Sequence, residues 1–191
     1  TLPSRILELE TVSPLSYYQQ VRRYWSYDSR LKPEIVIDQY DNFGNVLQLK
    51  KPNDLLTSFI WGYNGSLMTA VTQNASCNEI YFESFEDEKW LSDPYNPDKP
   101  ARYLLDRHNG RYSLYVKNGQ FGLSQLVDGL SQDRKYILSA WIKTEDGFDA
   151  SNGNQANLII QVIDKSNGQQ LAWLTTWVTQ TNGVWKLFER D

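Results

Sequence analysis

Short stretches that alternate apolar and polar residues, each ended by a turn signal, recur along this chain and leave no room for a long helix. Residues 5–10 (RILELE) alternate in this way, residues 34–40 (EIVIDQY) form another strand-like segment, and residues 46–50 (VLQLK) return after the turn at residues 41–45. A period of two is typical of half-buried strands, and Gly44 with its neighbouring Asn residues permits a tight hairpin turn. The sequence therefore predicts an all-β fold built from antiparallel strands.

Two parts are predicted, at residues 1–75 and residues 79–191. The first part continues with a strand at residues 57–63, whereas residues 67–73 fit either a strand or a short helix. The second part has longer strand-like segments between turns that contain Gly, at residues 80–85, 111–116, 121–127, 135–144, 156–164, 170–178 and 184–189. Strands at such short intervals predict a β-sandwich or jelly roll.

Charge and cysteine content exclude several classes of protein. The net charge is -4 and the Lys and Arg residues are scattered, so the chain lacks the basic surface that nucleic-acid binding requires. Cys77 is the only cysteine and His108 the only histidine, which excludes an internal disulfide and a zinc site made of Cys and His. The longest apolar run is too short to span a bilayer. We therefore expect no nucleic-acid partner and no membrane span.

A repeat-like unit lies in the first part. It reads Tyr40-Asp41-Asn42-Phe43-Gly44-Asn45-Val46, with a degenerate copy at Tyr27-Asp28, and Phe59-Ile60-Trp61-Gly62-Tyr63-Asn64 follows it. This pattern resembles the end of an array in the Rhs/YD-repeat family. The resemblance implies short antiparallel hairpins of a spiralling β-shell, in a bacterial protein that is secreted or displayed at the cell surface. Since one or two units cannot close such a shell, it also implies an open sheet edge.

Ordered motifs extend over the second part. They are Phe82-Glu83-Ser84-Phe85-Glu86-Asp87 with Trp90 behind it, residues 109–116 (NGRYSLYV), 123–126 (LSQL) and 135–143 (KYILSAWIK), and Gly183-Val184-Trp185. Together they resemble a carbohydrate-binding module with the galactose-binding-like jelly roll, without the closing strand that members of that family usually have. The resemblance implies a non-catalytic module that binds glycans. It also implies Glu86 as a ligand of a structural calcium ion, although the same acidic loop could simply be solvated.

The candidates for contacting a glycan are Trp141, Trp173, Trp177, Gln125 and Gln161. Sugar rings stack on flat aromatic faces, and amides beside those faces can bind the hydroxyl groups. Because strand side chains alternate, Trp173 and Trp177 are expected on one face of their strand, and Trp141 on the face opposite its apolar neighbours. The alternative is that these tryptophans pack in the core or against the repeat-like first part.

Catalysis is not expected. Glu83, Glu86, Asp87 and Glu88 crowd within a few residues, whereas a glycosidase pair must lie on the two sides of a sugar. His108 lies in a polar turn without a nucleophile motif, and we expect it to be an exposed turn residue. The sequence thus predicts a non-catalytic glycan-binding module. The rival hypothesis is a structural or assembly domain that caps the repeat shell, or that forms a homo-oligomer by strand addition.

Overall fold

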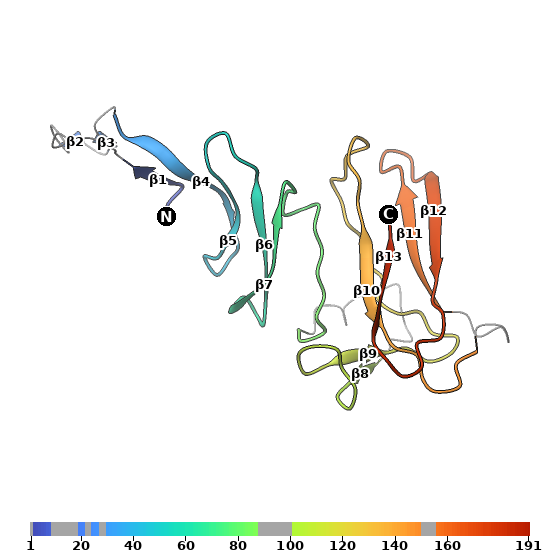
Figure 1. The fold of residues 1–191 in the computed structure, drawn as a ribbon. Helices are drawn as coiled ribbons and strands as arrows, with labels where there is room; N and C mark the ends of the chain where they lie inside the picture. The colour runs from blue at the N-terminus through green and yellow to red at the C-terminus, as the bar shows by residue number, and fades with distance from the viewer. Residues whose placement is uncertain (1, 9–18, 22–23, 27–29, 88–100, 150–155) are drawn as a thin grey trace. The chain divides into compact units, whose positions relative to one another are not determined.

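The chain is all-β. The computed structural model describes residues 2–8, 19–21, 24–26, 30–87, 101–149 and 156–191, and within these ranges every regular element is a strand (Figure 1). This confirms the all-β prediction. Several residues used in the sequence comparison, namely Tyr27, Asp28, Glu88 and Trp90, lie outside the described ranges. Within the described ranges, no helix is long and apolar enough to cross a membrane.

Contacts divide the chain into two compact units. Unit 1 comprises Thr1–Trp90 with Gln125–Gly129, and unit 2 comprises Leu91–Ser124 with Leu130–Asp191. Each unit is described by itself below. The domain boundary near residues 75–79 stays a prediction.

Unit 1 contains a five-stranded antiparallel sheet with the strand order β1-β4-β5-β6-β7. Its strands are β1 (Arg5–Glu8), β4 (Lys32–Tyr40), β5 (Val46–Lys50), β6 (Thr57–Gly62) and β7 (Leu67–Gln73), and β2 (Gln19–Val21) pairs separately with β3 (Tyr24–Ser26). Residues 67–73 are therefore a strand and not a helix. The strands from β4 to β7 are neighbours in both sequence and sheet, as expected when short turns join antiparallel strands.

The turn between β4 and β5 is held by the Asp and Asn of the repeat-like unit. The Asp41 carboxylate accepts hydrogen bonds from the backbone N–H groups of Phe43 (2.9 Å) and Asn45 (2.8 Å). The Asn45 amide donates to the same carboxylate at 2.9 Å and to the Gly65 carbonyl oxygen at 2.7 Å. Partial burial raises the pKa of Asp41, but these hydrogen bonds outweigh it and leave the pKa below its usual value. Asn45 thereby joins this turn to the turn between β6 and β7.

Residues 75–87 contact one face of this sheet, and we call them the covering segment. Ser58 in β6 is fully buried, and its hydroxyl donates to the Ala75 carbonyl oxygen at 2.7 Å. At the far end of β6, the Asn64 backbone N–H donates to the Asp87 carboxylate at 3.1 Å. The covering segment thus contacts the sheet at both ends of β6.

The strand predicted at residues 80–85 is wrong, because this covering segment has no strand partner. Phe85 has a φ of 62°, which a strand cannot accommodate, and its N–H donates to the Glu83 carboxylate at 2.6 Å. The Glu83 carboxylate thus accepts the hydrogen bond that the Phe85 N–H would donate to a neighbouring strand in a sheet. The strand predicted at residues 121–127 is wrong as well: Phe121 and Leu126 there are each 79% exposed.

The described residues of unit 2 form three antiparallel pairs of strands. The pairs are β8 (Ala101–Tyr103) with β9 (Ser113–Tyr115), β10 (Leu138–Ile142) with β13 (Lys186–Arg190), and β11 (Asn157–Ile163) with β12 (Gln170–Trp177). The strands β9 to β13 overlap predicted strands, whereas β8 was not predicted. Val178 is the one apolar side chain that is buried in the described parts of the chain. The jelly-roll arrangement stays a prediction.

Candidate ligand-binding face

The hairpin of β11 and β12 carries two of the predicted tryptophans on one face. In its register Trp173 lies opposite Gln161, Thr175 opposite Ile159 and Trp177 opposite Asn157. Directly opposed residues of an antiparallel pair point to the same side of the sheet. We call this surface the tryptophan face, and it brings together Trp173, Trp177 and Gln161 of the predicted site.

The tryptophan face is open to solvent. Trp173 is 52% exposed and Trp177 is 54% exposed, and Gln161 and Asn157 are exposed as well. On the opposite side of β12, the Thr176 hydroxyl donates to the Glu189 carbonyl oxygen of β13 at 3.4 Å. The hairpin therefore turns its Thr176 side toward β13. Neither tryptophan is buried in a core within unit 2, and their packing against the repeat-like part stays untested.

A hydrogen bond within the tryptophan face orients one of its rings. The Trp173 indole N–H donates to the hydroxyl of Thr175 at 3.1 Å. Thr175 lies two residues further along the same strand, so the indole is held along β12 in the direction of Trp177. A ring that is already fixed loses little side-chain entropy when a ligand stacks on it.

A β-bulge adds a further amide to the tryptophan face. The register shifts between Val162 and Ile163, so that Ile163 lies opposite Gln170 and not opposite Leu171. Simple alternation would place Gln170 on the other side of β12, and the bulge re-aims it. Its side-chain oxygen accepts a hydrogen bond from the Gln161 amide at 2.9 Å. Gln170 was missed in the sequence because a bulge has no clear signal in a strand pattern.

Trp141 belongs to the separate pair of β10 and β13, where it lies opposite Leu187. It is 47% exposed, and the His108 ring stacks on it with centroids 4.0 Å apart and planes 13° apart. Trp185 approaches the same histidine edge-on at 6.0 Å. His108 is exposed as predicted, but its stacking on Trp141 was not foreseen. Among the described residues, no ring contact joins Trp141 to Trp173 or Trp177.

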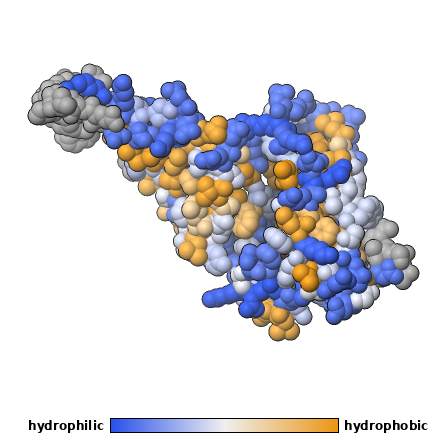
Figure 2. Space-filling model, in the orientation of Figure 1, coloured by the Kyte–Doolittle hydropathy of each residue, from blue (hydrophilic) through white to orange (hydrophobic). Residues whose placement is uncertain are grey.

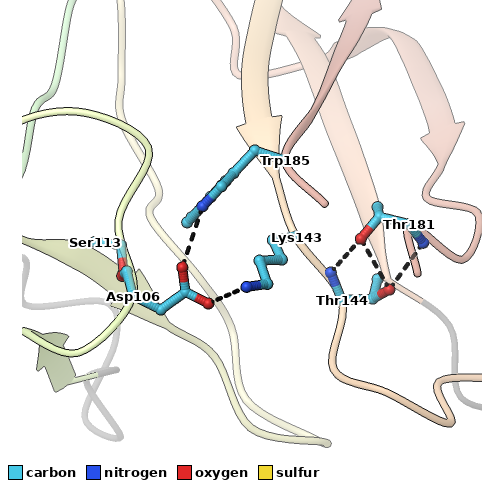
Figure 3. A network of polar contacts seen from close by, with 6 residues as sticks. All are labelled: Asp106, Ser113, Lys143, Thr144, Thr181 and Trp185. Carbon is cyan, nitrogen blue, oxygen red and sulfur yellow. Dashed lines mark hydrogen bonds and ion pairs between the residues drawn. The ribbon is translucent and has the colours of Figure 1, made fainter. Parts of the chain in front are cut away.

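Asp106 organises the polar side of this ring cluster (Figure 3). Its carboxylate forms an ion pair with Lys143 and accepts a hydrogen bond from the Trp185 indole N–H at 3.2 Å. The hydrogen bond from Lys143 is the main cause that lowers the pKa of Asp106. Partial burial opposes this shift, and the bond from Trp185 adds to it. These contacts use the carboxylate to hold a loop, so we assign Asp106 a structural role.

The remaining predicted residues lie elsewhere. Gln125 is exposed in unit 1, and its amide donates to the neighbouring Leu126 carbonyl oxygen at 2.8 Å. Glu86 is half-buried in the segment that covers the unit 1 sheet. The described residues contain no group of three or more His, Cys, Asp or Glu side chains that could hold a metal ion. The calcium site at Glu86 stays a prediction.

Comparison with protein-family models, with curated proteins and with solved structures gave no match for this chain.

Proposed function

We propose that this chain is a non-catalytic glycan-binding module, in which the tryptophan face of β11 and β12 contacts the sugar. The observation that carries the proposal is the half-exposure of Trp173 and Trp177 on one sheet face, each opposite an exposed amide. Large aromatic side chains left in solvent on a shared surface mark an interaction site more often than an inert one. The resemblances noted in the sequence add that the module belongs to a secreted or cell-surface bacterial protein.

The chemistry of this face suits a sugar better than a purely apolar partner. A pyranose ring offers C–H groups to an indole on one side and hydroxyl groups at its rim. On the tryptophan face the rim groups meet Asn157, Gln161 and Gln170, whose amides both donate and accept hydrogen bonds. No carboxylate, histidine or thiol belongs to the opposed pairs of this face, so it can bind a sugar but offers no group for acid–base chemistry.

Binding tests this proposal directly. We expect the whole chain to bind a subset of a polysaccharide array, and Trp173→Ala to weaken that binding by at least about tenfold because it removes a stacking surface. Trp141→Ala is the matched control, since it removes an equally exposed indole outside the tryptophan face. The variants would be compared by isothermal titration calorimetry after circular dichroism has shown that they fold. Equal losses in the two variants would contradict our assignment of the face.

An assembly role is the second candidate, favoured by β7. This strand is the last in the unit 1 sheet, and its exposed apolar side chains are Leu67 (54%), Met68 (51%) and Val71 (50%). Figure 2 shows apolar residues gathered over the strands of unit 1 in this view. Within the described ranges β7 has backbone hydrogen bonds only to β6, so its outer edge can accept another strand.

The assembly role predicts a homo-oligomer that depends on β7. Sedimentation velocity should show a dimer whose fraction grows with protein concentration, and Val71→Lys should shift it to monomer because a charge on an edge strand opposes pairing. Lys50→Ala, a change at an exposed residue of the interior strand β5, is the control. A chain that stays monomeric at the highest soluble concentration would argue against this candidate.

A further inference from the structure

We infer that the tryptophan face consists of two similar subsites in series along β12, and that its ligand is a linear polysaccharide chain long enough to contact both. This inference rests on the proposed glycan-binding function and specifies the class of glycan. It follows from the register of the hairpin, from the spacing of the two tryptophans and from the hydrogen-bonding groups beside them.

Each tryptophan has the same kind of neighbour across the hairpin. Trp177 lies opposite Asn157, and Trp173 lies opposite Gln161. Each pair combines one indole with one side-chain amide, which are the two groups needed to hold a single sugar ring. The same composition therefore occurs twice on one face, in the same orientation relative to the strands.

The two pairs are too far apart to hold one ring between them. Trp173 and Trp177 are four residues apart on a single strand, which at about 3.3 Å per residue places their backbone positions about 13 Å apart. The pair between them, Ile159 and Thr175, has neither an aromatic ring nor an amide. The spacing exceeds one sugar ring, so simultaneous contact with both tryptophans requires several linked rings that run parallel to β12.

The amides beside Trp173 keep both kinds of hydrogen-bonding group for a ligand. The bond between Gln161 and Gln170 uses one donor and one acceptor. This leaves the side-chain oxygen of one glutamine and the amino group of the other, whichever way round the bond runs. Sugar hydroxyls donate and accept, so both remaining groups can be satisfied by neighbouring hydroxyls of one chain.

The tryptophan face continues beyond Trp173 as an exposed strand surface. Ile163, which is 45% exposed, follows Gln161 on the same face, and the loop after Trp177 begins with the buried Val178. A sugar chain bound at both tryptophans can therefore extend along this face past Trp173.

Affinity as a function of ligand length tests this inference. The ligands are oligosaccharides of increasing length from partial hydrolysis of the polysaccharide that binds in the array, with cello-, xylo- and manno-oligosaccharides as the first series. We expect the affinity of the whole chain to rise by at least about tenfold once the oligosaccharide spans both tryptophans, since the second contact is then intramolecular, and to level off beyond that length.

Single variants separate the two subsites. Trp173→Ala and Trp177→Ala should each abolish the gain with length while keeping the weak affinity for the shortest ligands, and Trp141→Ala should keep the gain. Tight binding of a monosaccharide with no dependence on length would overturn the two-subsite inference and leave the proposed function standing. Absence of binding by the folded chain to any polysaccharide would overturn the proposed function, and this inference with it.

Discussion

Replacing Thr181 with valine is expected to destabilise unit 2 by about 2 kcal/mol, because it leaves the buried backbone N–H of Thr144 without its acceptor. Thr144 is 6% exposed and Thr181 is 1% exposed. The backbone N–H of each donates to the hydroxyl of the other at 2.9 Å, and the two hydroxyl oxygens lie 3.2 Å apart (Figure 3). Valine has nearly the shape of threonine, so Thr181→Val removes the acceptor of the Thr144 N–H without opening a cavity.

Urea unfolding followed by near-ultraviolet circular dichroism would measure this loss. Thr181→Ser is the matched control, because it keeps the hydroxyl and removes only a methyl group, which should cost about 1 kcal/mol. If the valine and serine variants lose the same stability, the hydrogen bonds contribute little and our account of this contact is wrong. The contact matters for the site because Thr181 follows β12 closely, and Thr144 follows β10.

Strands β4, β5 and β6 of unit 1 were predictable because local pattern and local turns decide them. At Val46–Lys50 the predicted and observed bounds coincide, since Asp41 and Asn45 close the preceding turn by themselves. The predicted strand at residues 57–63 is likewise close to β6. In such hairpins the partner of each strand is its neighbour in sequence, so alternation and a turn signal contain most of the information.

The segment at residues 80–85 shows where that information ends. Its aromatic residues favour a strand as those of β6 do, but β6 pairs with β5 and β7, whereas residues 80–85 form no strand. The positive φ of Phe85 and the bond from its N–H to Glu83 then decide the local conformation. Strand propensity depends on a partner strand, and no pattern within six residues reports whether a partner is present.

The tryptophan face was likewise predictable in part from the sequence. Alternation predicted that Trp173 and Trp177 share one side of their strand, and the hairpin register confirms this. The pairing of each with an amide depends on the register between β11 and β12, and the contribution of Gln170 depends on a bulge. These features are set by contacts between segments, which is why the candidate list held Gln161 but not Asn157 or Gln170.

Replacing Gly62 with alanine is expected to destabilise unit 1 by about 2 kcal/mol, because an added Cβ would overlap the side chain of Thr69. Gly62 is buried at the end of β6, and a Cβ placed there would lie 2.7 Å from the Thr69 Cγ2 methyl carbon and 3.4 Å from the Asp87 carboxylate. Thr69 cannot easily turn away, since its hydroxyl donates to the Ile60 carbonyl oxygen at 3.1 Å. The change should appear as a lower urea midpoint for unit 1.

A second substitution makes this prediction specific. Thr69→Ser keeps the hydroxyl that bonds to Ile60 and removes only the methyl group that an alanine at position 62 would strike. The double variant Gly62→Ala with Thr69→Ser should therefore recover most of the loss, so that the two changes are strongly non-additive. If the double variant is as unstable as the sum of the single changes, the overlap with Thr69 is not the cause of the loss. The covering contact of Asp87 near this end of β6 would then be the feature that excludes a side chain there.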